Sequence, residues 1–213
     1  MPLQEAAQAG AKLVILPEMW NCPYSNESFP KYAEDIEAGN SRSVSAMSDS
    51  AKEAGITLVA GSIPESSSGK LYNTCCIFDE QGKLLAKHRK VDHVATHLLQ
   101  SLSTETGTRP TDCRLLMPMP HVLSGQAWEP VQVHLFDIDI PGKITFKESE
   151  TLTQGESFTV VDTPACRMGI GICYDLRFPE LAMVYAQRGV QLIVYPGMAV
   201  DQLAVLLCVS QHQ

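Results

Sequence analysis

The sequence has no excess of basic residues, no long apolar run and no recognisable targeting segment. Its 213 residues include 16 Lys and Arg against 24 Asp and Glu, which gives a formal net charge of -8 at pH 7. Such a charge repels polyanions, so nucleic acid and anionic membranes are not expected partners. Because neither a run of about 20 apolar residues nor a signal peptide is present, we expect a cytoplasmic location, with a mitochondrial pool as the open alternative.

A regular cysteine pattern is also lacking. The seven cysteines are an odd number, and only Cys75 and Cys76 are adjacent. Disulfide frameworks occur in short chains with regular spacings, so reduced thiols are expected here. With 45% hydrophobic and 19% charged residues, the whole chain, 1–213, can bury an ordinary core as a single domain. A small molecule is then the expected partner.

Apolar spacing predicts helices and strands in alternation. In the first half, a helix between the cap candidates Ser41 and Gly55 leads into the strand Ile56 to Ala60, and a hairpin is predicted around the turn 79–82. In the second half, the strand before Cys173 is followed by a helix and by the strand Val190 to Tyr195. This βαβ order indicates an α/β domain in which ligands gather at the carboxyl ends of the strands.

One segment does not fit this alternation. Residues 91–133 contain four prolines and no sustained helical or strand period. A long stretch of this kind inside a compact domain indicates an insertion, which we expect to be disordered. Two histidines near the start of this segment, together with Cys113 and His121, are residue types that can bind zinc. Their spacing fits no recognised zinc site, so no metal is expected.

Three reactive side chains stand where strands end. Glu18, Lys90 and Cys173 each follow an apolar run, so they are expected at one edge of a sheet. A thiol at a strand-to-helix turn would meet the positive end of the helix dipole, which favours the thiolate and leaves N–H groups for an oxyanion. A carboxylate can accept the thiol proton, and an ammonium group can stabilise the oxyanion. These groups suffice for acyl transfer from an amide without a cofactor.

Each of these residues also has a simpler interpretation. Taken alone, Cys173 is more often a buried structural thiol, and isolated charged residues at strand ends are ordinary loop residues. Arg177 suits a substrate carboxylate, but a structural ion pair is equally consistent with the sequence. Tyr24 and Tyr72 fit packing or pocket walls better than chemistry.

The sequence blocks around these residues resemble the three successive motifs of the carbon-nitrogen hydrolase (nitrilase) superfamily, in the same order. The motifs are Leu16-Pro17-Glu18, His88-Arg89-Lys90 and Gly171-Ile172-Cys173-Tyr174-Asp175-Leu176-Arg177. Flanking segments such as Asn21-Cys22-Pro23-Tyr24 and Leu71-Tyr72-Asn73-Thr74 are similar to the omega-amidase branch. The resemblance covers residues 4–90 and 134–197.

The resemblance implies a four-layer αββα sandwich, a homodimer and an active site without metal or cofactor. Cys173 would be the nucleophile, Glu18 the general base and Lys90 the oxyanion-binding group. The Tyr174 backbone amide would be the second oxyanion donor, and Glu148 would position the lysine. The branch releases ammonia from the terminal amide of 2-oxoglutaramate or 2-oxosuccinamate through a Cys thioester, a reaction of glutamine metabolism.

The chain also departs from the family pattern. Its start matches the middle of the family's first helix, about forty residues separate Lys90 from His134, and residues 198–213 do not resemble family sequence. We therefore expect a partial domain, incomplete at both ends, with the strand Val190 to Tyr195 left unpaired. The alternatives are a catalytically inactive truncated isoform that pairs with an intact subunit, and another superfamily activity on a nitrile, a carbamoyl group or deaminated glutathione.

Overall fold

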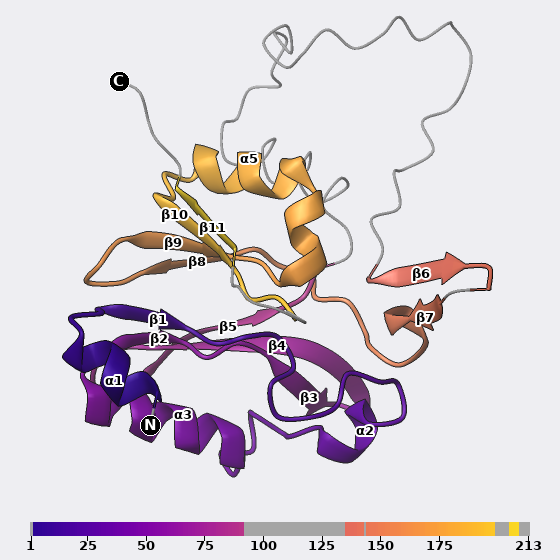
Figure 1. The fold of residues 1–213 in the computed structure, drawn as a ribbon, viewed down its shortest axis with the longest axis horizontal. Helices are drawn as coiled ribbons and strands as arrows, with labels where there is room; N and C mark the ends of the chain where they lie inside the picture. Colours follow the sequence, from indigo (N-terminus) through magenta and orange to yellow (C-terminus); the bar gives the residue numbers. More distant parts are fainter. Residues whose placement is uncertain (1, 92–134, 143, 199–204, 209–213) are drawn as a thin grey trace, which may run out of the picture.

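The computed structural model describes residues 2–91, 135–142, 144–198 and 205–208. These residues form four layers in the order helices, sheet, sheet, helix (Figure 1). The first half of the chain builds the lower helices and sheet of that view, and the second half builds the upper sheet and helix. The predicted αββα sandwich is confirmed.

The first sheet is organised around its longest strand. The elements of this half are α1 (Pro2–Gln8), β1 (Leu13–Ile15), α2 (Phe29–Tyr32), α3 (Arg42–Ala54), β2 (Thr57–Val59), β3 (Ile63–Ser67), β4 (Lys70–Phe78) and β5 (Leu84–Arg89). Strand β4 pairs antiparallel with β2, β3 and β5, and β1 pairs parallel with β2. Helices α1 and α3 cover the outer face of this sheet (Figure 1).

The second sheet contains the predicted βαβ unit. Its elements are β8 (Thr159–Asp162), β9 (Arg167–Ile170), the 3-10 turn η3 (Cys173–Arg177), α5 (Pro179–Gln187), β10 (Leu192–Tyr195) and β11 (Val205–Cys208). Strands β9 and β10 are parallel, as a crossover through a helix requires, and β8 and β11 lie antiparallel at the two edges.

Three apolar clusters separate the four layers. Neighbouring residues on a strand point to opposite faces of the sheet, and both faces of the first sheet are buried. Leu58 and Cys76 pack toward α1 and α3, whereas Val59 and Cys75 pack against the second sheet. A third cluster, which includes Tyr185, lies between the second sheet and α5. Both adjacent cysteines are buried, as predicted, and neither forms a disulfide.

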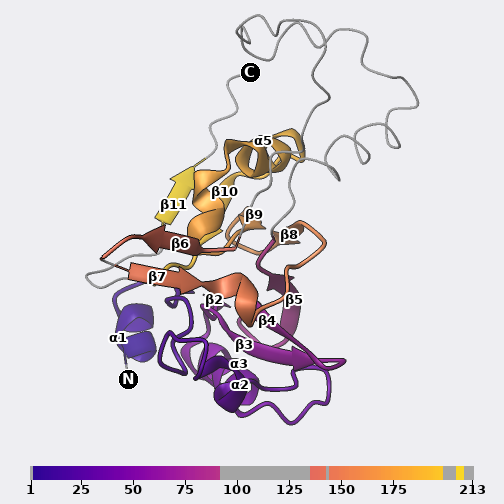
Figure 2. The same cartoon turned by 90° about the vertical axis from the view of Figure 1, so that its right-hand side faces the viewer.

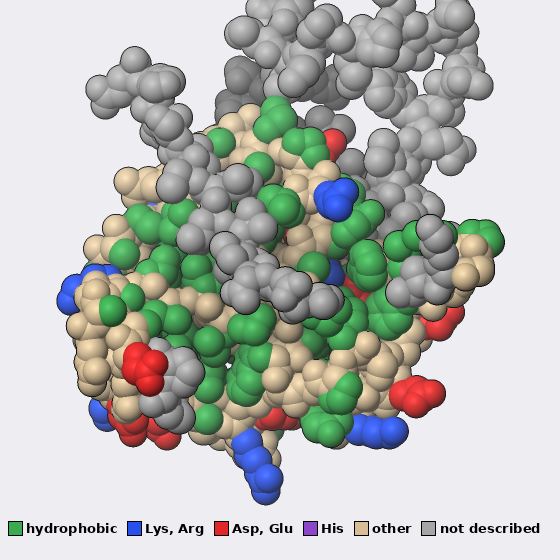
Figure 3. Space-filling view, viewed as in Figure 1, with side chains coloured by type: hydrophobic (Ala, Val, Ile, Leu, Met, Phe, Trp, Pro, Cys, Tyr) green, Lys and Arg blue, Asp and Glu red, His purple; other side chains and the backbone are tan. Residues whose placement is uncertain are grey.

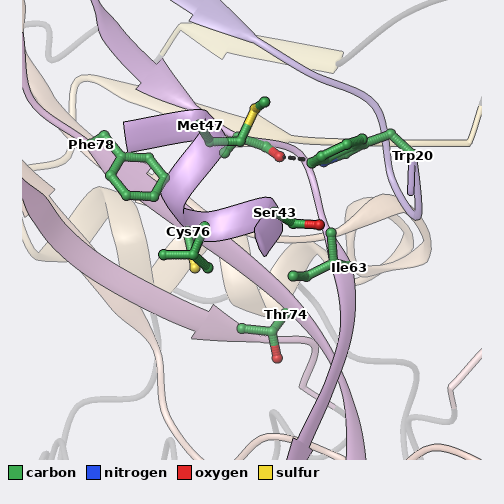
Figure 4. Close-up of a pocket in the computed structure, with 9 residues that line it drawn as sticks. Trp20, Ser43, Met47, Ile63, Thr74, Cys76 and Phe78 are labelled. Carbon is green, nitrogen blue, oxygen red and sulfur yellow. Dashed lines mark hydrogen bonds between the residues drawn. The ribbon is translucent and has the colours of Figure 1, made fainter. Parts of the chain in front are cut away.

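Helix α3 begins and ends where its caps predict. The Ser41 hydroxyl oxygen accepts a hydrogen bond from the Val44 N–H at 3.2 Å, and Gly55 ends the helix with a left-handed φ of 62°. A small cavity of about 10 Å³ lies between α3 and the sheet, where the Trp20 indole N–H donates to the Ala60 carbonyl at 2.8 Å (Figure 4). This volume holds about one water molecule, so it is a packing void and not a substrate site.

The prediction of an unpaired strand at 190–195 is wrong. Strand β10 pairs with β9 on one edge and with β11 on the other. The apolar segment Val205–Cys208 returns antiparallel to β10, so the backbone groups of that edge find partners within the chain.

A hairpin that was not predicted as such lies beside both sheets. It consists of β6 (Asp137–Ile140) and β7 (Ile144–Lys147), followed by the 3-10 turn η2 (Glu148–Glu150). Figure 2 shows it alongside the junction of the two sheets. Leu135 and Phe146 pack there against Met19 and Phe29 from the first half of the chain. The hairpin thereby brings Glu148 to the junction.

Two segments singled out in the sequence fall mainly outside the described residues. Of the predicted insertion 91–133, only Val91 is described, and it is buried and forms an isolated bridge with Gly155. Of the tail 198–213, only Met198 and β11 are described. The assignments of an insertion and of a non-family tail therefore remain predictions. The four residues considered as zinc ligands also lie outside the described residues. No described helix has the length and apolar character needed to cross a membrane.

Gly61 supports the turn that holds Glu18. A Cβ atom at this position would lie 2.0 Å from the Pro17 carbonyl oxygen, and φ is +63°. Gly69 has a similar φ of +75° with nothing within 4 Å, so it serves as the matched control. We expect Gly69→Ala to lower the free energy of unfolding by about 1 kcal/mol and Gly61→Ala to lower it by roughly 2 kcal/mol more. Equal urea midpoints for the two variants would contradict this.

Candidate active site

The predicted site residues meet at the junction of the two sheets and the hairpin. Glu18 follows β1 and Lys90 follows β5 in the first sheet, Glu148 opens η2, and Cys173 opens η3 after β9 of the second sheet. The expectation that one sheet edge holds all three reactive residues is therefore wrong. The two glutamates and the lysine are at most 2% exposed. Three separate structural units therefore contribute one cluster of reactive groups.

Lys90 lies between the two glutamates. Its Nζ is 3.1 Å from Glu18 Oε1 and 3.0 Å from Glu148 Oε2. The Phe136 N–H donates to Glu148 Oε2 at 2.8 Å, and the Met198 N–H donates to Glu18 Oε2 at 3.2 Å. Buried charges require this degree of pairing, and here two carboxylates share one ammonium group.

Two further side chains join this cluster, and the sequence prediction missed their part in it. The Tyr24 hydroxyl donates to Glu148 Oε1 at 2.8 Å and lies 3.5 Å from Glu18 Oε1. The Asn73 side-chain amide donates to Glu18 Oε1 at 2.8 Å. The buried asparagine of β4 was a general signal for a polar partner. Tyr24 lines the cleft, in agreement with its prediction as a packing or pocket-wall residue, but nothing local indicated its bond to Glu148.

A tight turn holds Cys173. Its φ of 47° lies in the left-handed region, which is uncommon for a residue other than glycine. The turn is closed by Asp175, whose Oδ2 accepts a hydrogen bond from the Ile172 N–H at 2.8 Å and whose own N–H donates to the Ile172 carbonyl at 3.0 Å. The Cys173 N–H donates to the Pro196 carbonyl at 2.8 Å.

The expectation that a helix dipole would favour the Cys173 thiolate is wrong. Burial raises the pKa of the thiol to about 12, the Glu18 carboxylate adds to the shift, and Lys90 opposes it. The rest of η3 and Phe178 separate Cys173 from α5, which begins at Pro179, and the Cys173 N–H is already bonded. The resting group is therefore a neutral thiol, and its reaction requires a base.

Lys90 keeps its charge at this depth. Burial alone would lower its pKa, but the carboxylates of Glu18 and Glu148 outweigh that effect and hold the pKa above its usual range. The cluster thus contains one ammonium group, two acidic side chains and one neutral thiol. Removing a proton from Cys173 without a proton acceptor would add a negative charge to a site that already has two acidic groups.

An open cleft gives access to Cys173. It has a volume of about 250 Å³ and is lined by Glu18, Tyr24, Phe136, Cys173, Tyr174, Arg177 and Met198. On the face shown in Figure 3, apolar side chains gather across the region where the two sheets meet. Arg177 is the one cation in the described lining of this cleft, and its guanidinium carbon lies 5.9 Å from the centre of the Tyr174 ring. The cleft can accept a small molecule that has an apolar body and an anionic end.

Comparison with known proteins agrees with this arrangement. The sequence model of the carbon-nitrogen hydrolase family matches residues 3–132 and, in an overlapping second stretch, residues 123–208. The chain belongs to the carbon-nitrogen hydrolase family. This match confirms the family resemblance, and the fold agrees with the one that the resemblance predicted.

Curated members of the carbon-nitrogen hydrolase family are similar over most of this chain. The Arabidopsis thaliana protein named "Omega-amidase, chloroplastic" is 49% identical over 197 residues, which are 92% of this chain and 42% of the relative. The human protein named "Omega-amidase NIT2" is 47% identical over 195 residues, which are 92% of this chain and 54% of the relative. The chain thus spans about half the length of the curated relatives it matches.

Two solved structures show the same fold. Saccharomyces cerevisiae Nit3, a member of branch 10 of the nitrilase superfamily, is 36% identical with a TM-score of 0.63, and the match covers 93% of this chain and 59% of that one. The NitFhit protein of C. elegans is 25% identical with a TM-score of 0.61, covering 92% of this chain and 38% of that one.

Proposed function

We propose that this chain is an omega-amidase that hydrolyses the terminal amide of 2-oxoglutaramate or 2-oxosuccinamate to the dicarboxylate and ammonia. The observation that carries the proposal is the Glu18, Lys90 and Glu148 cluster beside a neutral Cys173 in an open cleft. The names of the relatives support the choice of substrate. A cytoplasmic homodimer that acts in glutamine metabolism is part of the proposal.

The first half of the proposed reaction forms a thioester. Cys173 Sγ attacks the amide carbon while Glu18 accepts the thiol proton, because the high pKa of the thiol leaves almost no thiolate at neutral pH. Lys90 and the Tyr174 N–H stabilise the tetrahedral oxyanion. When this intermediate collapses, Glu18 returns the proton to the amine and ammonia leaves.

The second half restores the thiol. Glu18 removes a proton from a water molecule, the hydroxide oxygen attacks the thioester carbon, and the carboxylic acid is released as Cys173 takes the proton back. Glu148 keeps Lys90 in place through both halves, and Tyr24 and Asn73 donate hydrogen bonds that fix the positions of the two carboxylates. No step requires a metal or a cofactor.

Arg177 is proposed to bind the carboxylate of the substrate. It lines the cleft and has an exposed guanidinium group, which suits bidentate contact with a carboxylate. We expect Arg177→Gln to raise KM for 2-oxoglutaramate by about 10- to 100-fold with a smaller change in kcat. Arg167→Gln is the control, because Arg167 pairs with Asp162 on the surface, away from the cleft lining. An unchanged KM in Arg177→Gln would refute this role.

The test of the proposed function is ammonia release by the purified chain from 2-oxoglutaramate, with glutamine as the counter-substrate. Turnover of 2-oxoglutaramate with little turnover of glutamine is the expected result. Turnover of a nitrile, a carbamoyl compound or deaminated glutathione instead would replace the substrate and keep the cysteine chemistry. A folded sample with no turnover, beside an active full-length relative, would favour the inactive isoform.

A further inference from the structure

A buried histidine links the two sheets next to the reactive groups. His88 lies on β5, two residues before Lys90, and has no exposed surface. Its neighbours Lys87 and Arg89 bond Glu65 on one side of the strand. Because side chains alternate along a strand, His88 and Lys90 point to the opposite side, toward the second sheet.

The two ring nitrogens of His88 face two elements of that second sheet. Nδ1 lies 3.0 Å from the Thr159 hydroxyl oxygen on β8. Nε2 lies 3.8 Å from Asp175 Oδ2 and has no hydrogen-bond partner among the described residues. A ring that has its proton on Nε2 lets Nδ1 accept the Thr159 hydroxyl proton and turns an N–H toward the Asp175 carboxylate, at a distance longer than a hydrogen bond.

Asp175 is the residue that closes the Cys173 turn. The oxygen that faces His88 is the same one that accepts the Ile172 N–H. The chain of contacts therefore runs from β5, which leads to Lys90, through His88 and Asp175 to the backbone that holds Cys173 in a left-handed conformation. Both side chains are buried, so water screens the attraction between an N–H on Nε2 and the Asp175 carboxylate less than at the surface, and the 3.8 Å contact favours one position of Asp175.

We propose that His88 is a positioning residue that sets the location of the Cys173 turn relative to Lys90 and Glu18 through Asp175. This inference deepens the proposed function, because it assumes Cys173 as the reacting thiol. His88 touches no substrate in this arrangement. A simple packing role would require shape alone, whereas this role requires an N–H at the position of Nε2.

Three variants separate these roles. His88→Leu removes both ring nitrogens, His88→Gln retains an N–H donor that can reach Asp175, and Thr159→Val removes only the partner of Nδ1. We expect His88→Leu to lower kcat by about 10- to 100-fold with KM changed less than about 3-fold, because a displacement of about 1 Å is enough for such a loss. The Gln and Val variants should retain most of the parent kcat.

A second measurement does not depend on the substrate. Iodoacetamide labelling of the native chain at pH 8, resolved by peptide mass spectrometry, compares Cys173 with the fully buried Cys75 on β4. A loosened turn exposes the Cys173 thiol and moves it away from the Glu18 carboxylate. The labelling rate of Cys173 should therefore be several-fold higher in His88→Leu, and the labelling rate of Cys75 should not change.

The outcomes are distinct. If the parent fails to hydrolyse any omega-amide but His88→Leu still changes Cys173 labelling alone, the proposed function fails and the positioning role stands. If His88→Leu leaves both kcat and Cys173 labelling at parent values, or if it labels Cys75 and Cys173 faster together with a lowered melting temperature, His88 is a packing residue and the inference is overturned. Loss of kcat in His88→Gln equal to that in His88→Leu would also overturn it.

Discussion

Replacing Cys173 with alanine is expected to lower kcat for 2-oxoglutaramate by at least about 10³-fold, to the background level of the assay. The thiol is the one described nucleophilic sulfur in the cleft lining. The Tyr24 hydroxyl beside Glu18 does not replace it, because that hydroxyl donates to Glu148 and burial holds its pKa above the usual range. Stability should change little, because the side chain is only half-buried and its own N–H bond to Pro196 comes from the backbone. Ammonia release and thermal unfolding of the same sample measure both.

Cys166→Ala is the matched control for that experiment. Cys166 is also half-buried and packs against the same apolar cluster between the sheets, but it does not line the cleft. It should retain parent kcat. If Cys173→Ala kept measurable turnover above that of a mock purification, the thioester route would be wrong, whereas equal losses in the two alanine variants would point to a general effect on folding.

Replacing Lys90 with methionine is expected to have the largest effect on stability. Two buried carboxylates would then face each other without a cation, and breaking a buried ion pair from one side lowers the free energy of unfolding by about 3 to 5 kcal/mol. Activity should fall by at least about 10²-fold as well, since the oxyanion loses its charged partner. Urea unfolding at pH 8 measures the first effect, and ammonia release measures the second.

The pH dependence of Lys90→Met has a defined sign. With the cation removed, the Glu18 and Glu148 carboxylates repel each other, and adding a proton to either one relieves that repulsion in the folded chain. The destabilisation is then greatest well above the unfolded carboxylate pKa, and it diminishes as pH falls and the carboxylates become protonated. A loss that is the same at pH 5 and pH 8 would argue against charge repulsion as its cause.

Two variants test whether the loss at Lys90 is specific. Adding Glu148→Gln to Lys90→Met should recover much of the stability and none of the activity. Lys87→Met on the opposite side of β5 is the control, because its buried partner Glu65 keeps Arg89 at 2.7 Å. That variant should lose about 1 kcal/mol or less and retain turnover.

Local sequence patterns predicted the parts of the fold that depend on neighbouring residues. The caps of α3, the β4 and β5 hairpin and the βαβ unit around Cys173 follow from periodicity and turn residues, and all three are present. These are the features for which a window of ten to twenty residues contains the deciding information. Strand ends also predicted that Glu18, Lys90 and Cys173 lie close together, but the expected single sheet edge is wrong, because Cys173 follows a strand of the second sheet.

The rest depends on contacts between distant segments. Tyr24 reaches Glu148 across 124 positions, and Asn73 reaches Glu18 across 55, so no local pattern indicates either bond. The protonation state of Cys173 follows from burial and from Glu18, and both become known only once the sheets are docked. The pairing of β10 with Val205–Cys208 was missed for the same reason, since a short apolar segment does not indicate its partner.

The hydrogen bond from the Met198 N–H to Glu18 joins residues 180 positions apart. A contact of that range forms late in folding, because a long loop must close before the two residues meet. During synthesis, the hydrogen bond to Glu18 can form only after nearly the whole described chain has been made. Apolar faces of the first sheet remain open over that interval, and association with other chains at this stage competes directly with the appearance of activity.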